Sequence, residues 1–340
     1  MNFARESIFV GAIRSFCTSI AVILGLALGV GVVTIAVSVL VGPQYFPPRS
    51  EPMVMPDAQG ERMLLPGNSP AVLRIDFHGV IGMGDLVSSK IESLLLDSRE
   101  DFLKGDRVKA ILLHLNTPGG AADDADAIYR ALMHYKTQYK VPIYAYVEGL
   151  CASGGMYIAS AADKIYATPS SIIGSVGVIM GPTFNFSDAM TKIGVSSLTL
   201  TQGKDKDALN PFRPWKPGED ATLQAVIASL YHRFVSIVAA ARPLLTQDKL
   251  INDYGAHVYI AEEAEKLGYI DVADSDYSHA LTGLTEAAGL KDSYQVVQLT
   301  PFHPFLSGLA QSLSPQKIFQ WLGAPVTHEL SGKFLYLYSP

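Results

Sequence analysis

Hydrophobic and polar positions along the middle of the chain alternate between strand-like and helix-like periods. Residues 72–77 have the alternation and β-branched content of a strand, and residues 108–115 form a nearly continuous apolar run, as expected for a strand covered on both faces. Helical stretches are predicted at residues 86–103 and 123–139, and a third strand at residues 142–147. This order of strands and helices predicts a parallel sheet with helices on its faces.

The second half of the chain contains more predicted helices than strands. Helices are predicted at residues 154–162, 187–193, 218–242 and 279–288, and strands at residues 197–200 and 294–299. Residues 306–322 are amphipathic, which predicts a helix that covers the domain, with contact to lipid as the alternative. No internal repeat is evident, which favours one functional unit per chain.

A long apolar segment near the N-terminus predicts a membrane span. Residues 20–41 are almost wholly apolar, and a helix of this length can cross about 30 Å of hydrocarbon. The alternative is a cleaved signal peptide, but such apolar regions run about 7 to 15 residues, so we predict a retained anchor at residues 16–42. Arg5 and Arg14 precede it, which predicts that residues 1–15 are cytoplasmic and the remainder lies outside the cytoplasm.

Prolines separate the predicted span from the predicted folded domain. Residues 43–70 contain prolines that discourage regular structure, and we predict an irregular tether there. The folded domain is predicted at residues 71–275. Residues 276–340 form a C-terminal extension of uncertain role.

Charge and cysteine content exclude several classes of function. The net charge of -6, without a long run of Lys or Arg, argues against a nucleic acid partner. Only Cys17 and Cys151 are present, and Cys17 lies in the apolar segment, so neither a structural disulfide nor a cysteine-rich zinc site is expected. The histidines include no H-E-x-x-H pair, and we expect no metal and no cofactor.

Small residues at residues 116–120 follow a predicted strand and precede a predicted helix. This is the usual place for ligand sites in parallel sheets. The N–H groups of Gly119 and Gly120 can hold an oxyanion there, and the alternative is a simple strand-to-helix turn.

A second such segment, residues 149–155, contains a candidate nucleophile. Ser153 is predicted at a helix N-terminus, where the dipole favours an alkoxide and the N–H of Gly154 helps to bind an oxyanion. The alternative is that Ser153 only caps the helix. Cys151 is a competing nucleophile, but its place before the helix start favours packing.

The sequence offers few groups that can activate this serine. No histidine occurs between His134 and His232, and the others carry no accompanying motif, so a Ser/His/Asp triad is disfavoured. A lysine base must have its pKa lowered by several units from about 10.4. Residues 203–208 supply Lys204 and Lys206, although on composition alone this segment reads as a charged surface loop.

Four motifs, in this order and at these separations, resemble the signal peptide peptidase A family, also called protease IV. The resemblance covers residues 71–275. The motifs are Thr117-Pro118-Gly119-Gly120, Ala152-Ser153-Gly154-Gly155-Met156-Tyr157, Gly174-Ser175-Val176-Gly177-Val178, and Gly203-Lys204-Asp205-Lys206 followed by Pro211-Phe212. Met156 and Val176 depart from the family's usual tyrosine and isoleucine, and neither change removes a reacting group.

The resemblance implies a ClpP/crotonase-like parallel sheet and a Ser/Lys dyad. Ser153 takes the place of the nucleophile, and Lys206, three places after the glycine, that of the general base. Ser175 takes the place of the serine that positions the lysine. Gly154, together with the turn at Gly119 and Gly120, takes the place of the oxyanion donors.

The resemblance also implies partners and a location. It implies a homo-oligomer in which the lysine reaches the serine of an adjacent protomer, and peptide substrates such as remnants of cleaved signal peptides. The implied location is the bacterial inner membrane, single-pass, with the catalytic domain on the periplasmic side.

Two other classes of function stay open at this stage. One is a crotonase-like enzyme that acts on acyl-CoA thioesters, which would need neither the serine nor the anchor. The other is an inactive oligomeric membrane scaffold. A further hypothesis, based only on hydrophobicity, is that residues 334–338 enter a neighbour's groove as a self-substrate.

Overall fold

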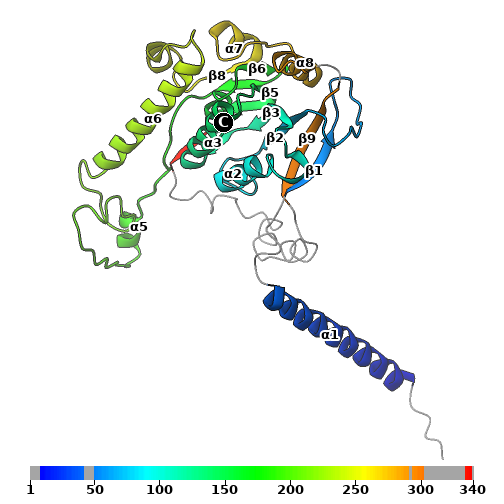
Figure 1. The fold of residues 1–340 in the computed structure, drawn as a ribbon. Coiled ribbons are helices and arrows are strands. Elements are labelled where there is room, and N and C mark those ends of the chain that lie inside the picture. The colour runs from blue at the N-terminus through cyan, green and yellow to red at the C-terminus, as the bar shows by residue number, and fades with distance from the viewer. Residues whose placement is uncertain (1–7, 42–49, 291–292, 302–333, 339–340) are drawn as a thin grey trace, which may run out of the picture. The chain divides into compact units, whose positions relative to one another are not determined.

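A computed structural model describes residues 8–41, 50–290, 293–301 and 334–338. The chain divides into two compact units, Met1–Arg49 and Ser50–Pro340, and each is described by itself (Figure 1).

The first unit contains one helix, α1 (Ile8–Val41), in the part that the structure describes. Its segment Val10–Val33 has a mean hydropathy of 2.4 and is long and apolar enough to cross a membrane. A helix in the second unit, α6 (Ala221–Ala241), also meets this criterion. However, its side chains Phe234 and Val238 are fully buried in the core of that unit, as expected for a core helix.

The second unit is built on an eight-stranded sheet with the order β1-β9-β2-β3-β5-β7-β8 and β6 beside β5. Neighbouring strands pair in parallel from β9 through β2, β3 and β5 to β7, and the edge strands β1 and β8 are antiparallel. The strands are β1 (Ser50–Met55), β2 (Ala71–His78), β3 (Val108–Thr117), β5 (Ile143–Ala152), β6 (Lys164–Ala167), β7 (Ile172–Gly174), β8 (Val258–Ile260) and β9 (Gln295–Pro301).

Helices cover both faces of this sheet, so the predicted α/β architecture is confirmed (Figure 1). They are α2 (Ser88–Asp97), α3 (Ala122–Tyr139), α4 (Gly154–Ala159), α5 (Ser187–Lys192), α6, α7 (Ala261–Leu267) and α8 (Tyr277–Ala287), with a 3₁₀ turn at Asp101–Leu103 and a π-helical turn at Lys249–Tyr254.

The two faces of the central strands belong to two separate apolar clusters. Leu73 and Leu113 pack with α2, α3, α4 and α6, whereas Val72 and Leu112 pack with α8. Because side chains alternate between the faces of a strand, burial on both sides requires apolar residues at nearly every position of β3. This explains the continuous apolar run.

The structure corrects four of the predicted elements. The tether is not wholly irregular, because residues 50–55 form β1; Pro52 is tolerated since β1 is an edge strand. The helix predicted at residues 86–103 ends at Asp97. Residues 197–200 are exposed and form no strand, and β5 continues past residue 147 to Ala152. The predicted helix at residues 306–322 lies outside the described residues.

Candidate active site

Ser153 lies in a strained turn between β5 and α4. Its φ of 53° and ψ of -114° are unfavourable for a residue with a side chain. The turn is held by two backbone hydrogen bonds, from the Ser153 N–H to the Gly174 oxygen (2.8 Å) and from the Tyr157 N–H to the Ser153 oxygen (3.0 Å). Ser153 is 1% exposed. Strained residues that the surroundings fix in this way cluster at active sites.

The Ser153 side chain does not cap α4, so the capping alternative is wrong for this helix. The thiol of Cys151, the competing nucleophile, packs in the core. Cys151 is fully buried, and burial raises its pKa to about 12, which leaves almost no thiolate at neutral pH.

We therefore expect the thiol of Cys151 to be inert in the native protein. Iodoacetamide at pH 8 should leave Cys151 unmodified until the chain is denatured, as read by peptide mass spectrometry of the alkylated sites. Cys151→Ala should keep peptidase activity within about threefold of wild type, since it removes packing and no reacting group. Rapid native alkylation together with loss of activity in this variant would instead identify Cys151 as the nucleophile.

A short strand, β4 (Gly119–Ala121), lies beside the turn at Ser153. A Cβ atom placed on Gly119 would lie 2.6 Å from the Gly154 nitrogen, so the two backbones approach as closely as glycine allows. The Gly119 N–H donates to the Thr117 Oγ1 (3.0 Å). Because the Gly119 N–H is engaged in this bond, the predicted oxyanion donors that remain at this junction are the N–H groups of Gly120 and Gly154.

Ser175 is also part of this junction. It directly follows Gly174, whose carbonyl oxygen accepts the Ser153 N–H, and its own N–H donates to the His257 oxygen (2.7 Å). Ser175 is 6% exposed and has a φ of 55°. The structure thus brings together Ser153, Ser175 and the three predicted glycines, on segments separated by up to 56 positions in the chain.

Lys206 lies apart from this group within the described chain. It is exposed in a loop, and no hydrogen bond or ion pair of its ammonium group occurs among the residues that the structure describes. The loop belongs to an arm that carries α5 and lies apart from the sheet (Figure 1). A single protomer therefore does not assemble the predicted dyad in this structure.

Arg213 fixes the loop that carries Lys206. Its place directly after Pro211-Phe212 is the one sequence feature that points to this role. Its guanidinium donates to the carboxylate of Asp207 (2.8 Å) and to the main-chain oxygen of the same residue (2.7 Å). It also donates to Glu219 (2.8 Å), just before α6. These bonds raise the pKa of Arg213 and lower the pKa values of both carboxyl groups.

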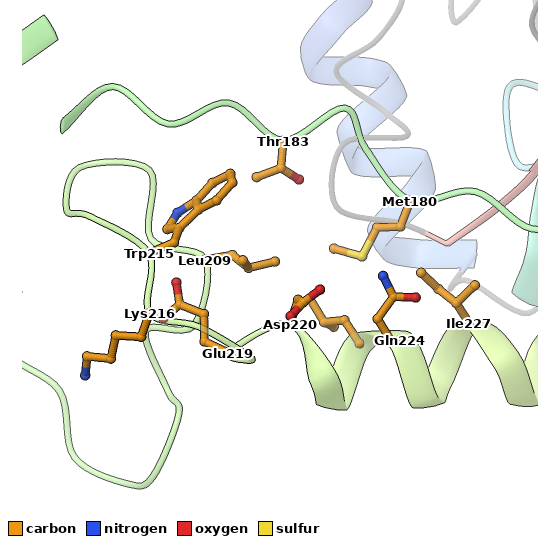
Figure 2. Close-up of a pocket in the computed structure, with 10 residues that line it drawn as sticks. Met180, Thr183, Leu209, Trp215, Lys216, Glu219, Asp220, Gln224 and Ile227 are labelled. Carbon is orange, nitrogen blue, oxygen red and sulfur yellow. The ribbon is translucent and has the colours of Figure 1, made fainter. Parts of the chain in front are cut away.

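A cavity of about 410 Å³ separates the arm from α6 (Figure 2). Met180 and Thr183 line one side, Leu209 and Trp215 another, and Gln224 of α6 the base. The Lys216 side chain points away from it. None of the predicted catalytic residues lines this cavity.

A cluster of Asp76, His78 and His114 is the group of described residues that comes closest to a metal site, with possible ligand atoms within 4.8 Å of one another. The Arg74 guanidinium occupies the cluster, 2.7 Å from Asp76 and 2.6 Å from the His114 Nδ1. Although burial opposes it, hydrogen bonds from His114 and Arg74 hold the pKa of Asp76 well below its usual range. A guanidinium repels a metal ion, so internal ion pairing explains this cluster.

Comparison with known proteins places the chain among peptidases. The profile of "Peptidase family S49" matches residues 135–291. The putative signal peptide peptidase SppA of Enterococcus faecium is 30% identical over 265 residues, which cover 75% of this chain and 74% of that protein. The putative protease slr0021 of Synechocystis is 30% identical over 277 residues, which cover 78% of this chain and 95% of that protein.

Two further comparisons are more limited. Protease 4 of Salmonella typhi is 29% identical over 249 residues, but these cover only 38% of that longer protein. The solved structure of a ClpP1 mutant from Listeria monocytogenes has 15% sequence identity and a TM-score of 0.38 over 60% of this chain. The sequence identity to the two proteases of similar length, over most of both chains, establishes that this chain belongs to peptidase family S49.

Proposed function

We propose that this protein is a membrane-anchored serine endopeptidase with Ser153 as nucleophile and Lys206 as general base. The observation that carries the proposal is the strained, buried turn at Ser153, which lies against the backbones of Gly119 and Gly154. Membership of a peptidase family supports hydrolysis of peptide bonds. A thioester enzyme would have no use for a serine held in this conformation.

The proposed reaction is acyl transfer through the serine. Neutral Lys206 takes the proton of the Ser153 hydroxyl as its oxygen attacks the scissile carbonyl carbon. The N–H groups of Gly120 and Gly154 stabilise the negative charge that develops on the carbonyl oxygen. The protonated lysine then gives its proton to the leaving amine, and a water molecule hydrolyses the acyl-enzyme. Ser175 orients the lysine amine.

The base is proposed to come from an adjacent copy of the chain. Large apolar side chains on the arm around Lys206 are exposed, and an exposed apolar patch of this kind favours an interface. They include Phe184, Phe186, Ile193, Leu198, Leu200 and Phe212. Burial of the arm against a second copy would also favour the neutral amine of Lys206 over the charged ammonium.

The proposed substrates are peptides in or beside the membrane, such as remnants of cleaved signal peptides. The helix α1 is long and apolar enough to act as the anchor, and anchoring enzyme and substrate to one surface raises their effective concentration. Arg14 lies in the N-terminal part of α1, which favours a cytoplasmic N-terminus and a periplasmic catalytic domain in a bacterial inner membrane.

Labelling with a fluorophosphonate probe tests the dyad directly. The full chain in detergent should be labelled on Ser153, and both Ser153→Ala and Lys206→Ala should lose labelling by at least about a hundredfold, because the nucleophile or its activation is lost. Lys204→Ala is the matched control, since Lys204 is an exposed lysine two positions away, and it should be labelled like wild type.

Three labelling results would contradict the proposed dyad. Absence of labelling in folded, oligomeric wild type would favour the inactive scaffold, and labelling that persists in Ser153→Ala would place the nucleophile elsewhere. Equal loss in Lys204→Ala and Lys206→Ala would show that the loop, and not one amine, is required.

A further inference from the structure

The strand β5 carries an irregularity directly before the turn that holds the proposed nucleophile. In its pairing with β3, Val147 lies opposite Leu115. Further along, Cys151 lies opposite Thr117, so two steps along β3 correspond to four steps along β5. The extra length lies in residues 148–150, here called the β5 bulge. Bulges bend a strand and redirect the side chains that follow, and they are common next to active sites.

The strand β5 also changes its neighbour at this bulge. Residues up to Val147 pair with β6, and residues from Leu150 onward pair with β7. The last residue of β7, Gly174, provides the oxygen that accepts the Ser153 N–H (2.8 Å). The length of chain in the β5 bulge thus decides which residue of the chain reaches Gly174, and with it where Ser153 lies.

The side chain of Ser171 joins the two ends of the β5 bulge. Ser171 is fully buried in the connection between β6 and β7. Its Oγ accepts the Gly149 N–H (3.1 Å) and donates to the Val147 oxygen (3.1 Å). The Thr168 hydroxyl group, 2.7 Å away, donates to the Ser171 Oγ, since the one proton of Ser171 is already used. One hydroxyl group therefore connects main-chain groups before and after position 148.

The strand β3 holds the opposite side of the β5 bulge. The Asn116 Oδ1 accepts the Leu150 N–H (3.2 Å). The His114 Nε2 lies 2.9 Å from a carboxylate oxygen of Glu148. Gly149 fits closely beside Asn116, because its φ is 109° and an added Cβ would lie 2.9 Å from the Asn116 Oδ1. Side chains from both neighbouring segments thus fix the conformation of the bulge.

The turn at Ser153 needs this support because its backbone is strained. A φ of 53° is unfavourable for a residue with a side chain, and such a conformation persists only where the surroundings enforce it. A displacement of about 1 Å at a reacting group can cost about 10²-fold in rate. Side chains that fix the strand leading into this turn therefore affect the rate without touching the substrate.

We propose that Ser171 and Asn116 are positioning residues for the peptidase reaction: they fix the β5 bulge, and the bulge places Ser153 against the oxyanion donors. The inference rests on the proposed function for its catalytic meaning. The two residues act through the backbone of β5, so they are not catalytic residues. Their effect on the conformation of the turn needs no catalysis and can be measured separately.

Kinetics of the full chain in detergent test the proposed role of Ser171. Ser171→Ala should lower kcat for a fluorogenic peptide by at least about tenfold, because the nucleophile is no longer held in place. KM should change less than about threefold, since a fully buried side chain contacts no peptide. Ser98→Ala is the matched control: Ser98 is equally buried and donates to the Leu95 oxygen (2.6 Å), but it lies at the end of α2. It should keep kcat within about threefold of wild type.

Amide hydrogen exchange tests the conformation of the turn independently of activity. In Ser171→Ala, peptides that cover residues 149–157 should exchange at least about tenfold faster than in wild type, because local opening becomes easier. In Ser98→Ala these peptides should exchange as in wild type. Thermal unfolding of both variants, measured in parallel, separates local opening from a general loss of stability.

An exposed residue keeps the test valid if Ser171→Ala does not fold. Asn116→Ala removes the acceptor of the Leu150 N–H at the surface, and it should lower kcat by at least about fivefold and speed exchange of residues 149–157. Asn116→Asp retains an oxygen in the same place and should recover kcat to within about threefold of wild type.

Unchanged kcat in both Ser171→Ala and Asn116→Ala would overturn the proposal. An equal fall in kcat in Ser171→Ala and Ser98→Ala would also overturn it, because a general loss of stability would then explain both. Unchanged exchange of residues 149–157 would overturn it even where wild type is inactive. Faster exchange of these residues without fluorophosphonate labelling of wild type would uphold the role of the bulge in holding the turn and refute the peptidase chemistry.

Discussion

Mixed oligomers of Ser153→Ala and Lys206→Ala subunits are expected to recover peptidase activity that each variant alone lacks. Each pure variant should lose activity by about 10⁴-fold or more, because nucleophile and base act as a unit. In a randomly mixed oligomer in which each lysine serves an adjacent subunit, a site is complete when its own subunit has the serine and the neighbour has the lysine. Equal mixing should therefore restore about one quarter of wild-type activity. Hydrolysis of a fluorogenic peptide after dissociation and reassembly measures this.

The expected recovery follows from the position of Lys206, which lies on an exposed loop and has no described contact with Ser153 of its own chain. A mixture of wild type with the double variant Ser153→Ala/Lys206→Ala is the appropriate control for exchange of subunits. A complete site in this mixture needs two neighbouring wild-type subunits, so activity should fall from about one half of the wild-type value before exchange to about one quarter after it. Failure of the two single variants to complement, despite proven exchange, would place both groups of the dyad in one protomer.

Gly119→Ala should lower kcat by more than about 10²-fold, an effect comparable to loss of an oxyanion donor. The added methyl group would lie 2.6 Å from the Gly154 nitrogen and would overlap the place of the Tyr336 carbonyl oxygen. It therefore moves the N–H of Gly154 away from the place where the negative charge is proposed to develop. Steady-state kinetics on a fluorogenic peptide, with thermal unfolding in parallel, separates this from loss of fold.

The backbone strain of this substitution needs its own control. Gly119 has a φ of 94°, so an alanine there is strained whatever the space around it. Gly60 has a φ of 83° and nothing within 4 Å of an added Cβ. Gly60→Ala should thus show the strain, a loss of about 1 kcal/mol of stability, with unchanged kcat. Equal kcat in both variants would remove the Gly119 backbone from the catalytic machinery.

The central elements of the fold follow closely from the sequence pattern. Residues 108–115 and 123–139 were predicted within two residues of β3 and α3, because strong periodicity and burial act over many positions there. The small residues near the ends of β3 and β5 likewise mark the junction at which the backbones of Gly119 and Gly154 approach each other. Hydrophobic periodicity and small residues at strand ends are local properties of the sequence, so the elements that depend on them can be predicted from the sequence.

Other features depend on partners that are distant in the chain. The strand β1 was missed because its prolines argue against strand structure unless the strand is known to lie at an edge. The strand β10 (Leu335–Leu337) pairs with β4, more than two hundred positions earlier in the chain, whereas hydrophobicity alone had suggested only a neighbour's groove for that segment. A strand was expected at residues 197–200, but Leu198 and Leu200 are exposed on the arm.

The pairing of β1 with β9 has a consequence for the order in which the protein folds. Ser50 lies opposite Pro301, and β9 also pairs with β2, so this side of the sheet cannot close before the ribosome has made almost the whole described domain. Until then the hydrogen-bonding edge of β2 stays open, as in other late-forming non-local pairings. During synthesis, β1 is therefore among the first strands of the domain to be made and among the last to find its partner.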